Sequence, residues 1–193
     1  MDDAAVIRAS LEDPAAFGDI FDRHYTAVLT YCSRRTGQAA GEEVAAQTFL
    51  VAFEIRGRFD LQATSARPWL LGIATNLIRR HFRDEKTHLN ALRRLPVDRS
   101  WHEDAHADRL DTLRHGQMLL NALHGFDPSD RDAFLLLALA DLSYDEIASA
   151  LQIPVGTVRS KIHRVRTRLR ERFPSDTAIQ WRETDEAADE ADG

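Results

Sequence analysis

The sequence predicts an all-α protein made of two small helical domains joined by a linker, the second of which ends in a helix-turn-helix. Three observations support this fold class. Apolar residues recur at intervals of three and four, and no segment shows the period of two that is typical of strands. Glycine and proline are sparse, at 9 and 6 of 193 residues, and they cluster at a few breaks. The length suits one or two small domains.

The first domain is predicted to cover residues 1–86. Its first helix opens at Asp13 and Pro14, because Asp is a favoured N-cap and Pro is tolerated at the first helical position. Apolar residues then recur at helical spacing, which indicates a buried stripe. The stripe comprises Phe17, Ile20, Phe21, Tyr25, Val28 and Leu29.

Two further helices complete this domain. Gly37 and Gly41 bracket a break, and a second helix is expected over about residues 42–56. A loop over 57–66 then leads to a third helix, whose apolar side includes Trp69. The C-terminal end of the third helix is basic, which also suits the helix dipole. Its basic residues are Arg79, Arg80, Arg83 and Lys86.

A segment of weak periodicity, residues 87–107, is interpreted as a linker, and a second helical domain follows over 108–173. Asp127 and Pro128 are expected to cap one of its helices. The run from Ser143 to Glu146 has the capping-box pattern, in which Ser and Glu satisfy each other's backbone N–H groups. These signals predict two helices before the last one, and an earlier helix is indicated by the spacing of Leu110, Leu113, Leu119, Leu120 and Leu123.

The end of this domain has the pattern of a helix-turn-helix. Pro154 and Gly156 mark a short turn, since the residue before a proline leaves the α region. In the helix that begins near Val155, an apolar stripe packs inward, and the opposite face is the one that a major groove would meet. The stripe comprises Val158, Ile162, Val165 and Leu169.

Charge is distributed very unevenly around this last helix. Residues 156–173 carry seven basic side chains and one acidic side chain, whereas residues 174–193 carry seven acidic and one basic. The overall charge of −6 therefore hides a basic segment of the kind that phosphate contacts require. The acidic tail, 174–193, is predicted to be disordered because it has too little apolar surface to fold alone.

On the outer face, Arg164 can bind guanine O6 and N7 with two hydrogen bonds, and Ser160 can contact several base edges. Arg159 and Lys161 are better placed for phosphates. The run from Leu142 to Leu151 and then from Pro154 to Arg166 closely resembles region 4 of extracytoplasmic-function (ECF) sigma factors, which reads the promoter −35 element. The resemblance implies DNA contacts there, and the full predicted set is Thr157, Arg159, Ser160, Lys161, His163 and Arg164.

The N-terminal half resembles region 2 of the same family. The run from Glu42 to Leu50 is similar to the family's polymerase-binding helix, which implies contacts by Glu42, Glu43, Gln47 and Leu50. One departure is that a glutamine common in the family falls at Ala46, and Gln47 occupies the next position. The run from Trp69 to Asn76 resembles the helix that engages the −10 element. The residues predicted to bind that element are Phe59, Asn76, Arg79, Arg80 and Arg83.

Physical chemistry agrees with this second resemblance. Opening a promoter requires bases to be held outside the DNA stack, which costs free energy. Aromatic side chains in a basic groove offset this cost by stacking on the exposed bases. Phe59 is either such a platform or a core residue, whereas Trp69, on the apolar stripe, is expected in the core.

Other functions find little support in the sequence. The single cysteine, Cys32, excludes an internal disulfide and a Cys-rich metal site and favours a cytoplasmic location. His102 and His106 have helical spacing but lie in the expected linker, so no metal or cofactor is predicted. No catalytic constellation, signal peptide or membrane-spanning run is evident, and the chain is not expected to be an enzyme.

We therefore predict an alternative sigma factor whose partners are bacterial core RNA polymerase and promoter DNA. An anti-sigma factor is a further partner that the resemblance allows. Two alternatives remain open from sequence. One is a stand-alone helix-turn-helix regulator with an N-terminal sensing domain, and the other is a polymerase-bound adaptor that mimics a sigma factor without reading DNA.

Overall fold

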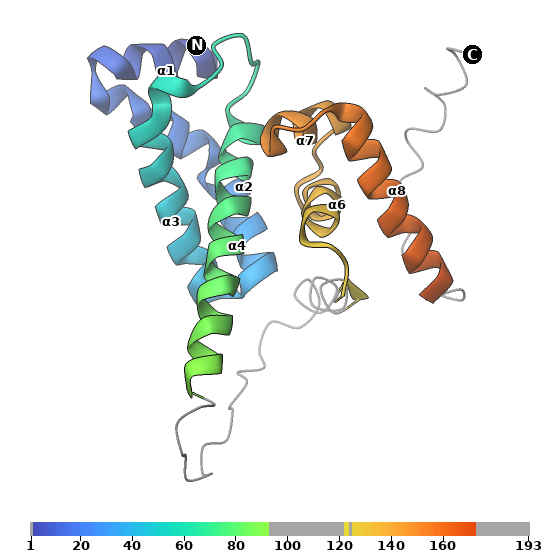
Figure 1. Ribbon diagram of the computed structural model, residues 1–193. Helices are drawn as coiled ribbons and strands as arrows, with labels where there is room; N and C mark the ends of the chain where they lie inside the picture. Colours follow the sequence, from blue (N-terminus) through green and yellow to red (C-terminus); the bar gives the residue numbers. More distant parts are fainter. Residues whose placement is uncertain (1, 93–121, 124, 173–193) are drawn as a thin grey trace, which may run out of the picture.

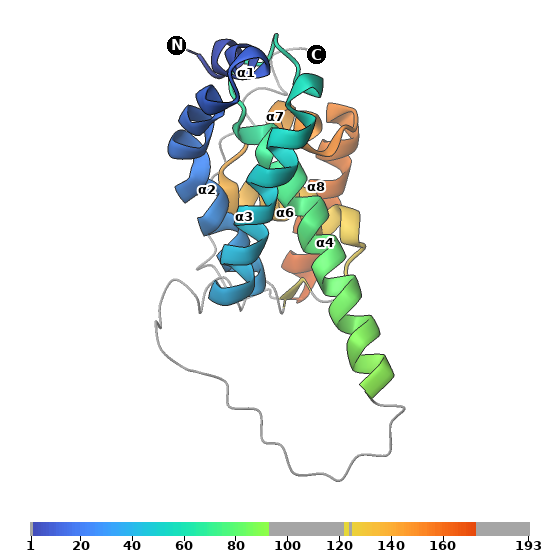
Figure 2. The same ribbon diagram turned by 90° about the vertical axis from the view of Figure 1, so that its left-hand side faces the viewer.

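Helices account for every regular element that the structure describes, as the sequence predicted. The structure is a computed structural model that describes residues 2–92, 122–123 and 125–172 (Figures 1 and 2). The elements, in chain order, are α1 (Asp3–Glu12), the 3-10 turn η1 (Pro14–Phe17), α2 (Gly18–Thr36), α3 (Gln38–Ile55), the 3-10 turn η2 (Arg56–Arg58), α4 (Arg67–Leu92), α6 (Pro128–Ala140), α7 (Tyr144–Leu151) and α8 (Val155–Arg172).

The expected linker lies only partly within this description. α4 continues to Leu92, through the first residues of the segment interpreted as a linker over 87–107. The rest of that segment, with His102 and His106, lies outside the described residues, and so does the acidic tail over 174–193. The predictions made for them therefore stay predictions.

The first helix of the chain, α1, was not predicted from the sequence. It packs the buried side chains of Val6 and Ile7 into the N-terminal core. Its Asp3 carboxylate lies 2.7 Å from His24 Nε2 on α2 and accepts the backbone N–H of Ala66 at 2.8 Å. Burial by itself would raise the pKa of Asp3, but these hydrogen bonds and His24 lower it overall. Asp3 thus ties α1 to α2 and to the start of α4.

Of the two glycines expected to bracket a break, only Gly37 does so. Gly37 has a φ of +83° between α2 and α3, a conformation that favours glycine. Gly41 instead lies inside α3, where a Cβ atom would come within 2.5 Å of Ser33 Cα on α2. The expectation of a break at Gly41 was therefore wrong, and its glycine permits close contact between the two helices.

The C-terminal unit is built as its capping signals predicted. Asp127 accepts the backbone N–H of Ser129 at the start of α6, and Ser143 and Glu146 form a reciprocal capping box at the start of α7. α7 ends at Gln152, which has a φ of +54°, and α8 begins three residues later. The predicted stripe of α8 is buried, which fixes the rotation of α8 about its axis. Its members are Val158, Ile162, Val165 and Leu169.

The N-terminal and C-terminal units pack against each other through α4 and α7 (Figure 1). A Cβ atom on Gly72 would lie 2.2 Å from the carbonyl oxygen of Ala150, so this approach requires glycine. Beside this contact, Asp132 of α6 is fully buried and binds two cations of the N-terminal unit, Arg35 at 2.6 Å and Arg79. Arg35 also donates to the hydroxyl of Tyr31 at 2.8 Å. A buried ionic cluster therefore joins the two units.

This cluster makes Asp132→Asn a strongly destabilising substitution. Losing the carboxylate leaves the buried Arg35 without its counter-charge, which typically costs about 3–5 kcal/mol. We expect that loss in the free energy of unfolding, measured by urea denaturation.

Asp84→Asn is the matched control. Asp84 pairs with Arg80 at 3.6 Å, and both side chains are mostly exposed, so the change should be within about 1 kcal/mol. Equal effects of the two substitutions would show that the buried cluster contributes no more than a surface pair.

Candidate nucleic-acid interface

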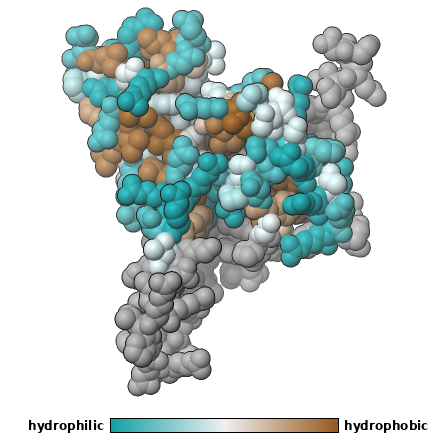
Figure 3. All heavy atoms as spheres, viewed as in Figure 1, coloured by the Kyte–Doolittle hydropathy of each residue, from teal (hydrophilic) through white to brown (hydrophobic). Residues whose placement is uncertain are grey.

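The outward face of α8 collects the residues that the sequence predicted for DNA contact. With the apolar stripe turned inward, the side chains of Arg159, Ser160, His163 and Arg164 are exposed, and they line one hollow of about 480 Å³. Thr157 is half-buried at the N-terminal end of the same helix. The surface over α8, on the right of Figure 3, is mostly hydrophilic. A continuous polar and basic face therefore projects from the helix-turn-helix.

Two of the predicted cations, Lys161 and Arg164, bind the same carboxylate. Arg164 donates from Nε to Asp130 Oδ2 at 2.8 Å and from Nη2 to Asp130 Oδ1 at 2.9 Å. Lys161 Nζ donates to Asp130 Oδ1 at 2.9 Å and to Ser129 Oγ at 2.6 Å. The Lys161 side chain is only 14% exposed, whereas that of Arg164 is 52% exposed. Lys161 is thus turned toward α6, and Arg164 still faces solvent.

The same contacts perturb the ionisation of Asp130. The hydrogen bond from Arg164 is the largest cause, and with Lys161 it lowers the pKa of Asp130 to about 2 despite partial burial. Asp130 is not among the residues that the sequence predicted for this site. It shows only as an acidic residue in the first turn of α6, and nothing local relates it to Arg164, 34 positions later.

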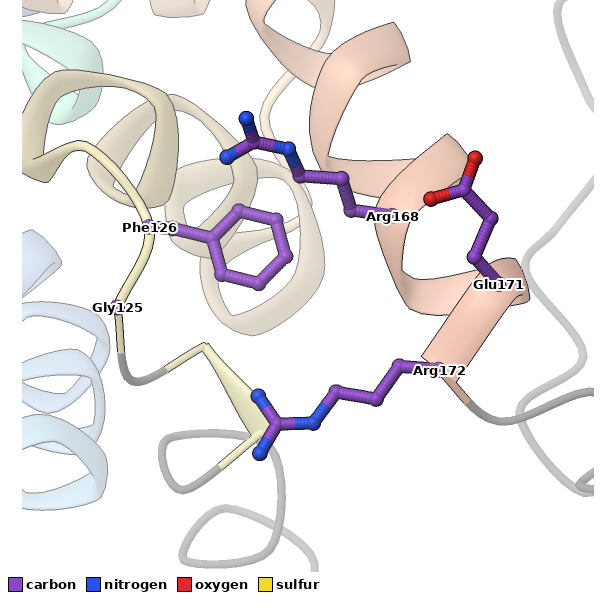
Figure 4. A pocket seen from close by; sticks show the side chains of 5 residues that line it. All are labelled: Gly125, Phe126, Arg168, Glu171 and Arg172. Carbon is purple, nitrogen blue, oxygen red and sulfur yellow. The ribbon is translucent and has the colours of Figure 1, made fainter.

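A second hollow, of about 400 Å³, lies beside the C-terminal half of α8 (Figure 4). The ring of Phe126 lies between the side chains of Arg168 and Arg172, and the Arg168 guanidinium carbon is 5.8 Å from the ring centroid. This geometry is that of a cation–π contact. Arg166, in contrast, donates to the hydroxyl of Tyr144 at 3.3 Å and packs along α7. The basic side chains of α8 therefore differ in their contacts and in their exposure to solvent.

The residues predicted to bind the −10 element, four on α4 and Phe59 before it, differ in their exposure. Asn76, Arg80 and Arg83 are exposed, and their spacing of four and three places them on one helical face. Arg79 is turned toward Asp132 and is 33% exposed. Phe59 is 6% exposed, with its ring edge-on to Trp69 at 5.2 Å between centroids. Phe59 is thus a core residue in this structure, and Trp69 packs against the core as expected.

The residues predicted to bind polymerase share the exposed face of α3. Glu43, Gln47 and Leu50 are exposed at helical spacing, with Glu42 beside them, and Leu50 is 66% exposed. Phe21, which the sequence placed in a buried stripe, is instead 39% exposed, and its ring stacks on that of Tyr25. Apolar colours are frequent over the N-terminal unit, at the upper left of Figure 3. An exposed apolar surface beside acidic side chains is typical of a protein-binding face.

Comparison with known proteins gives this arrangement a family. The model of sigma-70 region 2 matches residues 20–88, and that of sigma-70 region 4 matches residues 116–169. The RNA polymerase sigma factor CarQ of Myxococcus xanthus is 31% identical over 172 residues, or 81% of this chain and 88% of CarQ. The ECF sigma factor SigC of Mycobacterium tuberculosis is 31% identical over 130 residues, or 67% and 68% of the two chains. The chain belongs to the ECF group of sigma-70 factors.

As an ECF sigma factor, the protein directs transcription initiation by RNA polymerase, and it is not itself an enzyme. The family thereby decides among the three hypotheses that the sequence left open. The fold agrees with that of the sigma factor RpoE in complex with the anti-sigma factor NepR from Bartonella quintana. That structure aligns with a TM-score of 0.59 and 20% identity over 83% of this chain and 98% of the other.

Within residues 2–92, 122–123 and 125–172, no helix combines the length and apolarity that crossing a membrane requires. In the same part of the chain, no three His, Cys, Asp or Glu side chains gather as metal ligands would.

The effect of truncating the buried Phe59 distinguishes a core residue from a platform on which bases stack. We expect Phe59→Ala to lower the free energy of unfolding by about 3–5 kcal/mol, because the deletion leaves a cavity beside Trp69. Thermal denaturation measures this effect.

Permanganate reactivity of promoter thymines, at a temperature where the variant is folded, measures promoter opening separately. Phe82→Ala, at an exposed aromatic residue of α4, is the control for stability. An unchanged stability together with impaired opening would show that Phe59 acts as a base platform and not as a core residue.

Proposed function

We propose that this sigma factor recognises its promoters through two separate faces. The exposed face of α8 reads the −35 element, with Arg159, Ser160, His163 and Arg164 as the contacting residues. The exposed face of α4, with Asn76, Arg80 and Arg83, binds the −10 element. The observation that carries the proposal is the solvent-facing polar hollow on α8, which gathers the four residues implied by the resemblance to region 4.

The proposed division of labour follows the chain. Residues 1–86 form the unit that binds polymerase and the −10 element, 87–107 link the units, 108–173 read the −35 element, and 174–193 form the acidic tail. The exposed face of α3 around Leu50 docks on core RNA polymerase, supported by its exposed apolar area and its acidic neighbours. The protein acts where the polymerase is, in the cytoplasm.

An anti-sigma factor is a further proposed partner. The solved relative from Bartonella quintana is in complex with an anti-sigma factor. In this chain, the exposed side chains of Phe21 and Leu50 offer an apolar surface that such a partner would cover in competition with polymerase.

The decisive experiment is transcription with purified components. We expect core RNA polymerase and this protein together to initiate at one or more specific promoters, whereas neither initiates alone. Promoters are found by run-off transcription on fragmented genomic DNA of the source organism. Tight footprints by the protein alone, without any added activity of core polymerase, would contradict the proposal.

The −35 assignment is tested by comparing two arginines of α8. We expect Arg164→Ala to cost about 1–3 kcal/mol in the preference for one base over another at a single −35 position, as loss of a bidentate base contact does. Arg168→Ala is the matched control, because Arg168 is also exposed on α8 but packs over Phe126. It should weaken binding of all sequences about equally. Equal weakening by Arg164→Ala would make Arg164 a phosphate contact.

A further inference from the structure

Asp130 occupies an unusual place for a carboxylate in a DNA-binding unit. It lies in the first turn of α6, not on α8, and is 8% exposed. Its two oxygens accept three hydrogen bonds from the cations of α8, one from Lys161 and two from Arg164. A negative charge beside the proposed DNA-binding face of α8 weakens its electrostatic attraction to the phosphates of any DNA sequence. A favourable effect of Asp130 on DNA recognition would offset this loss of affinity.

The geometry of the contact between Asp130 and Arg164 indicates what this favourable effect is. Asp130 binds the side of the guanidinium formed by Nε and Nη2, with donor–acceptor distances of 2.8 and 2.9 Å. An arginine has five N–H groups in a rigid planar fork, so this contact leaves the outer edge, formed by Nη1 and the second Nη2 hydrogen, for another acceptor. Arg164 also lines the polar hollow on α8 and is half exposed.

We propose that Asp130 is a positioning residue for base reading, which holds the Arg164 guanidinium with its outer edge toward one guanine of the −35 element. The inference rests on the proposed function of α8 as the −35 reader. The two parallel hydrogen bonds restrain both the side-chain torsions and the plane of the guanidinium. A restrained fork loses less conformational freedom on binding and offers two hydrogen bonds in the plane of a base pair, which guanine O6 and N7 accept.

Lys161 has a supporting part in this arrangement. Its ammonium shares Asp130 Oδ1 with Arg164 and also donates to Ser129 Oγ, so a second cation holds the same carboxylate in place. With both cations bound, Asp130 stays ionised over the whole pH range in which transcription is measured, since its pKa is about 2. The contact between Asp130 and Arg164 therefore does not change with pH in these experiments.

The experiment uses the full chain in holoenzyme with core RNA polymerase. The wild-type holoenzyme first selects promoters from a library randomised across the −35 element. Competition binding then gives the preference for guanine over adenine at each position. Because this preference is a ratio of two DNAs for one protein sample, a smaller folded fraction in a variant cancels.

We expect Asp130→Ala to reduce the preference for guanine about tenfold at the one position where Arg164→Ala also removes it, within the range that one bidentate contact supplies. Other positions should keep their preferences. Asp130→Asn, which retains one acceptor oxygen, should lose less. In the Arg164→Ala background, Asp130→Ala should have no further effect on preference, because the residue it positions is gone.

Asp127→Asn is the matched control. Asp127 precedes the same helix and caps it through the N–H of Ser129, a contact that Asn also makes. The substitution removes the same unit of negative charge near α8 without touching Arg164. It should raise affinity for all DNA sequences and leave the preference for guanine unchanged.

The outcomes are distinguishable. Undiminished preference at every position in Asp130→Ala would overturn the inference, and so would a loss that adds to that of Arg164→Ala. A uniform gain in affinity with unchanged preference would show that Asp130 only masks charge. A wild-type holoenzyme that selects no promoter would overturn the proposed function before any variant is compared, and the inference with it.

Discussion

The arrangement of the two described units depends on the buried ion pairs that Asp132 forms with Arg35 and Arg79. An ionised group without water requires opposite charges at close range, and here they come from the other unit, as Arg35 and Arg79. Arg35 is itself oriented by the Tyr31 hydroxyl, which lies 2.9 Å from Thr75 Oγ1. The approach of α4 to α7 at Gly72 is a further close contact between the two units. The two units are therefore joined by charge as well as by apolar contact.

α6 links the two proposed DNA-binding faces because it carries two carboxylates with different orientations. Asp130 and Asp132 are two residues apart, so they point about 200° apart around the helix. Asp130 turns toward α8 and binds Arg164 and Lys161, while Asp132 turns toward α2 and α4. Each carboxylate binds a residue predicted to contact promoter DNA. As long as Asp132 binds Arg79, the face of α4 proposed to bind the −10 element presents Asn76, Arg80 and Arg83 without Arg79.

The basic side chains of α8 thus have different surroundings. Lys161 and Arg166 are half-buried and bind side chains of their own unit, and Arg168 lies over an aromatic ring. Arg159 is exposed, and Arg164 is exposed while it binds Asp130. General attraction to phosphates needs only the summed charge of the helix, whereas base reading needs a side chain held in one orientation. In our proposal, the hydrogen bonds from Asp130 prepare Arg164 for base reading, whereas the other basic residues of α8 contribute mainly charge. These residues look equivalent in the sequence.

Local signals determined much of this protein. The caps at Asp127 and Ser143, the turn at Pro154 and the stripe of α8 depend on neighbours within a few residues, so the sequence alone predicted the helix-turn-helix and its outer face. Tertiary structure decided whatever depends on distant partners. The burial of Phe59 under Trp69, the helix contact at Gly41, and the pairing of Asp130 and Asp132 with cations 31 to 97 residues away have no local signature. Hydrophobic periodicity reports which face of a helix is buried, but not which side chain of another helix meets it there.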